Sequence, residues 1–495
     1  MGEEILSSEF SAQDFTDFKH KLENETEQLA EIFAQRGFAE SPPVAGFELE
    51  AWLVDEKFRP VPRNEEFLAR LSNPLASPEL ASFNIEVNTE PRLLQGHVFS
   101  AMHQSLDATW ADCRATAQAL GMDVIMCGIL PSLLDEDLTL ANMSGMQRYR
   151  ALNREVLLRR KGKPLVLDIN GVEHLRVSHH DVMLESAATS FQLHTQINQT
   201  LAARLYNASL VLSAPMVALC ANSPYLFGRD LWDESRIPLF EQAVATGGYD
   251  AAAFGPIRRV TFGSGYVRES LLECFTENLA HYPVLLPVNR DSDCGTLPHL
   301  RMHNGTIWRW NRPLIGFDDK GEIHLRIEHR VIPSGPSSLD AVANAAFYYG
   351  VAMALVNLPT AVEWQLPFDK ARDNFYRAAQ LGLRAPLHWL DDKSYAASEL
   401  LSKILLPLAF EGLERLGVAG SDRDEYLGII RQRLESGTNG AVWQRAFVDR
   451  HGRDMQALTA AYGHKPAHDA TRSQPDPFAG KKARPPVSLR VIARE

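Results

Sequence analysis

The segment GFELEAWL (residues 46–53) alternates apolar residues with acidic ones. A side-chain period of two predicts a β-strand in which Phe47 and Leu49 face one side, while Glu48 and Glu50 project together from the other. Two carboxylates that share one face repel each other unless a cation lies beside them. The segment therefore predicts a two-faced strand, with one apolar and one acidic face.

Three later segments repeat this alternation: FNIEVNTEP (83–91), SFQLHTQI (190–197) and IHLRIEHR (323–330). The residues of interest on their polar faces are Glu86, His194, Arg326, Glu328 and Arg330. A single strand of this kind is best explained by an ordinary antiparallel sheet with one face in water. Four such strands, with no lysine beside the glutamates of the first two, instead favour a functional site.

The residue types on these faces indicate the chemistry. Several carboxylates with one imidazole and no cysteine form a ligand set typical of Mg²⁺ or Mn²⁺ rather than of structural zinc. The arginines of the fourth strand suggest an anionic substrate, because guanidinium groups pair with phosphate or carboxylate. Metal ions and arginines together favour phosphoryl transfer.

Apolar residues at helical spacing predict helices in five places, and short strands lie between them. The predicted helices cover residues 11–37, 97–120, 198–214, 340–357 and 395–416. The longest apolar run, 341–358, is long enough to raise the question of a membrane span. Asn344 and Asn357 near its ends, and the absence of a second such run, favour a buried core helix, so we expect no membrane span.

Composition limits the function further. The formal net charge of −12 argues against a general nucleic-acid binder, so we expect small-molecule partners. The five cysteines form no CxxC pair, and the acidic N-terminus lacks the features of a secretory signal, so we expect a cytoplasmic protein. A symmetric homodimer is the default expectation for a soluble enzyme of this size.

Taken in order, the polar strands resemble the second family of glutamate-cysteine ligases, carboxylate-amine ligases whose catalytic domain is related to glutamine synthetase and the guanido kinases. The resemblance rests on six segments: GFELEAWL (46–53), PELASFNIEVNTEP (78–91), FQLHTQI (191–197), ALCANSPYLFG (218–228), GTIWRWNRP (305–313) and HLRIEHRVIPS (324–334). Each alone is common, but the ordered set is fairly specific.

The resemblance implies a site, residue by residue. The implied metal ligands are Glu48, Glu50, Glu79, Glu86, His194 and Glu328. Arg330 is implied as the phosphate-contacting arginine and, with Glu50, as a catalytic residue. The expected nucleotide-binding residues are Arg309, Arg312, Arg326 and Asn222. For Arg309 and Arg312, a surface arginine pair beside an aromatic residue is an equally good explanation, and Asn222 also fits a simple helix end.

The expected fold is α+β, a large curved and mainly antiparallel sheet with helices on its outer face and the site in its concave face. We expect one catalytic domain over residues 1–465, with a helical C-terminal part from about 365, and a mobile, basic, proline-rich tail over 466–495.

The expected activity uses ATP and Mg²⁺ or Mn²⁺ to form an amide through an acyl phosphate, with glutamate as carboxylate and cysteine or another amine as acceptor. The alternatives are a guanido kinase, an enzyme of the glutamine synthetase type, or an inactive scaffold protein.

Overall fold

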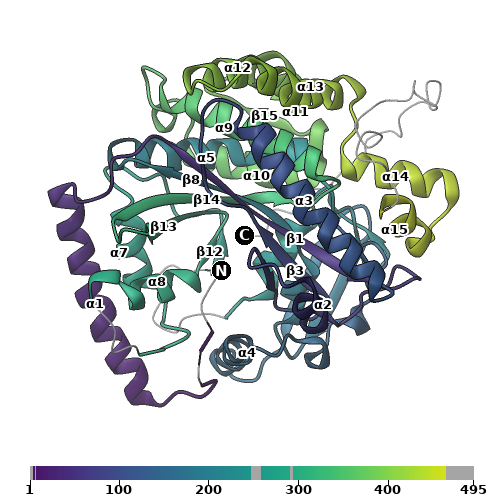
Figure 1. Cartoon of the computed structure of the whole chain (residues 1–495), viewed down its shortest axis with the longest axis horizontal. Coiled ribbons are helices and arrows are strands. Elements are labelled where there is room, and N and C mark those ends of the chain that lie inside the picture. Colours follow the sequence, from purple (N-terminus) through teal and green to yellow (C-terminus); the bar gives the residue numbers. More distant parts are fainter. Residues whose placement is uncertain (1–3, 6, 247–257, 290–293, 464–495) are drawn as a thin grey trace, which may run out of the picture.

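The polar strands predicted from the sequence lie together in one curved antiparallel sheet (Figure 1). The computed structural model describes residues 4–5, 7–246, 258–289 and 294–463. The path of the sheet runs β13 (Asn311–Phe317), β14 (Ile323–Pro333), β8 (Ser190–Ile197), β1 (Val44–Val54), β3 (Asn84–Asn88) and β2 (Ala76–Pro78). Two further strands, β4 (Arg92–Leu93) and β5 (Asp123–Ile125), also pair with β1. The predicted tail, 466–495, lies outside the described residues.

The apolar face of the sheet packs against a layer of helices. Phe47 and Leu49 of β1 are buried in the same core as the inward faces of α3 (Val98–Ala119), α5 (Gln199–Cys220) and α9 (Ser338–Val356). The hydroxyl of Tyr349 on α9 donates to the carbonyl oxygen of His194 at 2.8 Å, which ties this layer to β8. The predicted α+β fold, with helices on the outer face of an antiparallel sheet, is confirmed.

A second group of helices covers α5 and α9 from outside. The helices of this C-terminal part are α10 (Phe368–Leu381), α11 (Ala397–Leu400), α12 (Leu406–Arg415), α13 (Gly420–Ser436), α14 (Gly440–His451) and α15 (Met455–Gly463). α9 and α12 touch through their backbones, because a Cβ on Gly412 would lie 1.8 Å from the carbonyl oxygen of Gly350. Glycine at both positions is therefore a packing requirement.

Among the described residues, two helices, α5 and α9, are long and apolar enough to cross a membrane, so the expectation that 341–358 is the single run of this kind was wrong. The most apolar window of α9 is 100% buried inside the structure, and that of α5 is 89% buried. Helices that are apolar on all sides are typical of the core of a large protein as well as of membranes. The burial agrees with the core helix predicted at 341–358.

Other helices lie around the opposite, polar side of the sheet (Figure 1). They are α1 (Ala12–Gln35), α4 (Gln147–Arg159), α6 (Arg236–Ala243), α7 (Leu272–His281) and α8 (Pro298–Gly305), whereas α2 (Asn64–Leu71) packs against α3. Four small two-stranded ladders complete the described structure: β6 (Leu165–Asn170) with β7 (His174–His179), β9 (Tyr225–Leu226) with β10 (Arg229–Asp230), β11 (Val260–Thr261) with β12 (Trp308–Arg309), and β15 (Pro386–His388) with β16 (Ser394–Ala396).

Candidate active site

Strand register brings the predicted polar residues onto one face of the sheet. Glu50 lies opposite Glu86, and Glu328 lies opposite His194. These side chains are buried: Glu86 is 0% exposed, Glu328 1% and Glu50 8%. A face that simply met water would expose its carboxylates, so the ordinary explanation for alternating strands does not hold here.

Three of the predicted metal ligands form a compact cluster. Each of Glu50, Glu79 and Glu86 offers a carboxylate oxygen, and these oxygens all lie within 4.8 Å of one another. Glu79 follows β2, so a loop residue joins two strand residues. Among the described residues, these three glutamates are the one set of potential ligands that lie close enough together to share an ion.

The oxygens of this cluster are unequally satisfied. Glu50 accepts hydrogen bonds from the backbone N–H and hydroxyl of Ser190 at 2.6 and 2.9 Å, and from Gln192 at 2.9 Å. By contrast, Oε1 of Glu79 and Oε2 of Glu86 are buried without a hydrogen-bond partner. Buried polar atoms are rarely left unpaired, and hard divalent cations prefer carboxylate oxygens. The donor set therefore fits Mg²⁺ or Mn²⁺.

The pKa values of the cluster reflect crowded negative charge. Burial, followed by the charge of Glu48, raises the pKa of Glu86 to about 7. Burial and the charges of Glu86 and Glu50 raise the pKa of Glu79 well above its ordinary value. A carboxyl with a raised pKa holds its proton near neutrality, and a bound cation would favour the ionised form instead.

Glu48 and His194 form a second group beside the cluster. Nε2 of His194 lies 2.9 Å from Oε1 of Glu48. Burial by itself raises the pKa of Glu48, but the adjacent His194 outweighs it and leaves the pKa below its ordinary value. Oε2 of Glu48 and Nδ1 of His194 are buried and unpaired, so both residues keep an atom available for a ligand.

Glu328 is held by arginines rather than by the carboxylate cluster. Nη2 of Arg312 lies 2.7 Å from one of its oxygens, and Nε of Arg330 lies 3.0 Å from the other. These positive charges outweigh burial and lower the pKa of Glu328. The six predicted ligands thus divide into three carboxylates, the Glu48–His194 pair, and one glutamate enclosed by guanidinium groups.

The arginines retain free donors. Arg330 donates from Nη2 to Gln192 at 3.0 Å, but its Nη1 is buried and unpaired. Nε of Arg326 and Nε of Arg312 are also buried without a hydrogen-bond partner. Guanidinium donors in this state favour an anion such as phosphate or carboxylate.

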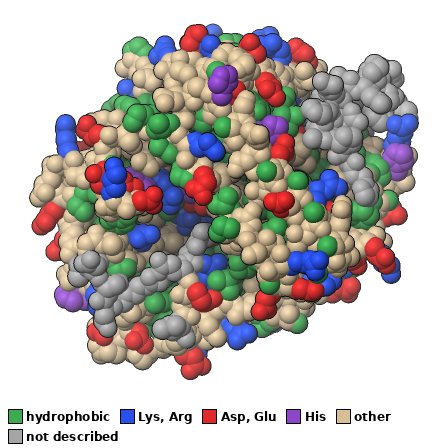
Figure 2. Space-filling view, in the orientation of Figure 1, with side chains coloured by type: hydrophobic (Ala, Val, Ile, Leu, Met, Phe, Trp, Pro, Cys, Tyr) green, Lys and Arg blue, Asp and Glu red, His purple; other side chains and the backbone are tan. Residues whose placement is uncertain are grey.

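A cavity of about 420 Å³ opens onto part of this site, whereas Glu50, Glu86, His194 and Arg330 do not line it. Its sheet side includes Glu48, Arg312, Arg326 and Glu328, and Glu79 lies at its edge. Helices α4, α7 and α8 supply much of the remaining wall, which is largely apolar. Figure 2 shows basic side chains inside a hollow on the face viewed there. A cavity of this size, with a few convergent polar groups, is typical of small-molecule sites.

Three charged cavity residues were not predicted: Glu185, Arg148 and Arg301, the last of which lies on α8. Glu185 lies in the short 3-10 helix η3 (Met183–Ala187), and burial together with the charge of Glu50 raises its pKa to about 8. Arg148 comes from the first turn of α4. None of the three lies on an alternating strand. The only sequence signal for Glu185 is its position just before the strand of His194.

The structure does not bring Arg309 to the cavity. On β12, its Nη1 donates to Asn278 at 2.5 Å, and its Nη2 lies 3.3 Å from a carboxylate oxygen of Glu277. The guanidinium is 1% exposed and engaged away from the residues that line the cavity. Of the arginine pair singled out in the sequence, only Arg312 reaches the cavity.

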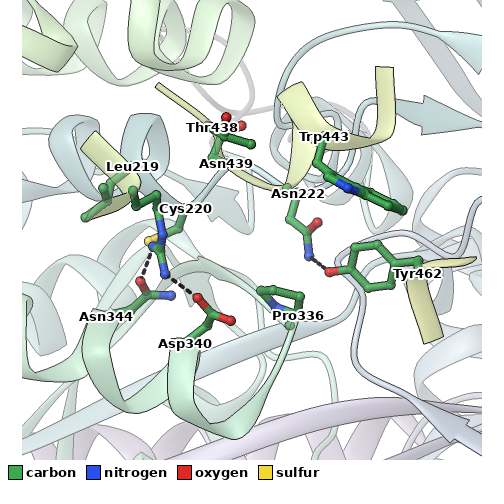
Figure 3. Close-up of a pocket in the computed structure, with 13 residues that line it drawn as sticks. Leu219, Cys220, Asn222, Pro336, Asp340, Asn344, Thr438, Asn439, Trp443 and Tyr462 are labelled. Atoms are coloured by element: carbon green, nitrogen blue, oxygen red, sulfur yellow. Dashed lines mark hydrogen bonds and ion pairs between the residues drawn. The ribbon is translucent and has the colours of Figure 1, made fainter. Parts of the chain in front are cut away.

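Asn222 does not line this cavity but a separate, smaller pocket between the end of α5 and the C-terminal helices (Figure 3). Its Nδ2 donates to the carbonyl oxygen of Ser334 at 2.8 Å and to the hydroxyl of Tyr462 at 2.6 Å. Its Oδ1 accepts from Gln444 at 3.0 Å. These contacts join the end of α5 to the C-terminal helices, which favours the helix-end interpretation of Asn222 over nucleotide binding.

Comparison with known proteins gives one family. The model of Glutamate-cysteine ligase family 2 (GCS2) matches residues 44–464, which is most of the chain. A search of curated proteins gave no match.

One solved structure supports the fold, and two others are similar to a lesser degree. A glutamate–cysteine ligase from Francisella tularensis in complex with AMP superposes with a TM-score of 0.50 at 12% identity, covering 87% of this chain and 91% of that one. A bifunctional glutathione synthetase from Pasteurella multocida gives 0.49 at 12% identity, covering 89% and 53%. The complex of the prokaryotic ubiquitin-like protein Pup and its ligase PafA gives 0.36 at 11%, covering 85% and 71%. At these identities the first similarity supports the fold alone.

Proposed function

Because the chain belongs to glutamate-cysteine ligase family 2, we propose that it is an ATP-dependent carboxylate-amine ligase that joins the side-chain carboxylate of glutamate to an amine. The observation that carries this proposal is the buried cluster of Glu50, Glu79 and Glu86 beside a cavity lined by arginines. Phosphoryl transfer from ATP to a carboxylate needs acidic ligands that hold a cation and basic groups that bind the anionic substrates.

The glutamates would hold the metal. Glu50, Glu79 and Glu86 form the first candidate site, and the unpaired atoms of Glu48 and His194 offer ligands for a second ion. A bound Mg²⁺ or Mn²⁺ supplies positive charge that lets the phosphates of ATP approach a substrate carboxylate.

The arginines stabilise the transferred group. In the reaction, an oxygen of the substrate carboxylate bonds to the terminal phosphorus of ATP, and the bond from that phosphorus to ADP breaks. In this proposal Nη1 of Arg330 and Nε of Arg312, which are buried without a hydrogen-bond partner, donate to the phosphoryl oxygens. The amine then attacks the acyl carbon, loses a proton, and releases phosphate.

The enclosing cavity protects the acyl phosphate. Its apolar side, including Leu152, Phe275 and Met302, limits the water that could hydrolyse the intermediate before the amine arrives. The acceptor is therefore expected to enter a largely apolar space. Cysteine is the first candidate because of the family, and other small amines are the alternatives.

The test measures phosphate release from ATP with Mg²⁺ or Mn²⁺, glutamate and a panel of amines that includes cysteine. We expect release that requires both glutamate and one amine, and its loss in Glu50→Gln but not in the control Glu90→Gln, whose side chain is exposed. A stable phosphorylated product that regenerates ATP from ADP would indicate a guanido kinase instead. Nucleotide binding without release for any pair would favour a scaffold protein.

A further inference from the structure

The helix α1 precedes the part of the chain that matches the family, which begins at residue 44. It packs against α7 and α8 (Figure 1), and both of these helices supply residues to the cavity wall. Most of its buried positions are apolar, among them Phe18, Leu22 and Leu29. Glu25 is the charged residue among the buried positions of α1.

Glu25 is 4% exposed, and both of its carboxylate oxygens contact residues in the first turn of α8. Its Oε1 lies 2.5 Å from Nδ1 of His299, and its Oε2 accepts from the backbone N–H of Leu300 at 2.8 Å. His299 is 3% exposed, and its ring meets Phe18 edge-on at 5.2 Å. Burying a carboxylate costs stability unless it is well paired, and both oxygens of Glu25 have a partner on α8.

The carboxylate replaces a missing helix cap. The residue before α8, Leu297, has a left-handed backbone with φ of 50° and offers no side-chain cap. The first N–H groups of a helix need acceptors, and a negative charge is favourable at that end. Glu25, on α1, supplies both the acceptor and the negative charge to the N-terminus of α8. The position of α8 therefore depends on α1.

The opposite end of α8 reaches the candidate active site. Asn304 donates from Nδ2 to the carbonyl oxygen of Pro313 at 2.9 Å. The carbonyl oxygen of Gly305 accepts from Nη1 of Arg312 at 3.4 Å, and the same arginine pairs with Glu328. Leu300, Arg301, Met302, Asn304 and Gly305 all line the cavity. A shift of α8 would thus move both the wall and Arg312.

The residues before α1 contact the same cavity. Ile5 is 3% exposed, lines the cavity, and belongs to a small apolar cluster with Leu286 and Met302. Oε1 of Glu4 accepts from the backbone N–H of Arg148, at the start of α4. The N-terminal segment therefore contacts two of the helices that enclose the cavity.

We propose that Ile5 and helix α1 are part of the active site of this protein. Ile5 forms part of the cavity wall, and Glu25 is a positioning residue that fixes the position of α8 and, through α8, that of Arg312. The proposal rests on the proposed function for its link to ATP, whereas the hold of Glu25 on α8 stands without it. Glu25 touches no reacting atom; it acts through His299 and the N-terminus of α8.

The test compares Glu25→Gln with Glu27→Gln, an exposed position on the same helix, in the full-length protein. Loss of a charged, buried hydrogen-bond acceptor should speed amide exchange in residues 299–305 by about tenfold. Binding of a non-hydrolysable ATP analogue with Mg²⁺ should weaken by a similar factor. In the ligase assay the KM for ATP should rise more than kcat falls, because the sheet residues remain in place.

The outcomes separate the two proposals. Unchanged exchange in α8 would overturn the role of Glu25, and so would faster exchange spread evenly over the sheet, since that indicates general destabilisation. Faster exchange in α8 with unchanged nucleotide affinity would overturn the link to the active site. A wild type that binds no nucleotide contradicts the proposed function instead, and the exchange data still decide whether Glu25 holds α8. If Glu25→Gln does not fold, Glu25→Asp gives the same comparison, because the shorter side chain withdraws the carboxylate from the backbone N–H of Leu300.

Discussion

Removing one glutamate of the carboxylate cluster should make the metal-free protein more stable. In the folded protein the pKa of Glu86 is raised from an ordinary 4.5 to about 7, with burial as the main cause. Between these pH values the unfolded chain has lost the proton while the folded chain keeps it. Stability that is fully present below pH 4.5 is therefore lost as the pH rises through 7.

The size of this effect follows from the interval between the two pKa values. One pKa unit corresponds to about 1.4 kcal/mol, so ionisation of Glu86 should cost the metal-free protein about 3 kcal/mol by pH 8. Glu86→Gln removes that charge while keeping the shape of the side chain. The variant should gain about this amount of stability at pH 8 and little at pH 4.5.

The assay is unfolding by urea and by heat, in EDTA and in excess Mn²⁺, at pH values from 4.5 to 8. With Mn²⁺ the order should reverse, because wild type gains binding free energy that the variant has partly lost. The control Glu90→Gln changes an exposed carboxylate of the same segment and should follow wild type. A metal-free Glu86→Gln that is less stable than wild type at pH 8 would refute this reasoning.

Two further predictions concern His194, which lies beside Glu48 in the candidate site, and Asn222, which lies outside the cavity lining. His194→Gln should weaken Mn²⁺ binding by about 10- to 100-fold, because Glu48 loses the partner that keeps it ionised; unchanged affinity in a titration followed by electron paramagnetic resonance would contradict this. Asn222→Ala should cost about 1–3 kcal/mol of unfolding free energy, because the carbonyl oxygen of Ser334 and the hydroxyl of Tyr462 lose a buried partner. Its KM for ATP should equal that of wild type, and a raised KM would restore Asn222 as a nucleotide ligand.

The strands and their faces were predictable because alternation is a local property. The segment around Glu48 and Glu50 folds as the strand expected from its period of two, and the same holds for the strand of His194. What the period could not reveal is that the polar face is itself buried. That fact depends on α4, α7 and α8, which come from other parts of the chain.

Because local patterns do not reveal contacts with distant parts of the chain, some cavity residues were missed and Arg309 was wrongly expected in the cavity. Glu185 and Arg148 reach the cavity from a short 3-10 helix and from a helix start, where no periodic pattern marks the side that faces inward. Arg309 stands close to Arg312 in sequence, but the two lie on different strands, β12 and β13, and have different partners. Proximity along the chain did not predict proximity in space.

The backbone contact between Gly350 and Gly412 has a consequence for mutational screens. Neither residue lines the cavity, yet any side chain at either position must push α12 away from α9. The uncovered helix is as apolar as a membrane span. Such variants would lose activity as completely as a change at Glu50, but by precipitating or associating with lipid. A screen that records activity alone would count two spacer positions among the catalytic ones, and measuring the soluble fraction tells the two kinds of failure apart.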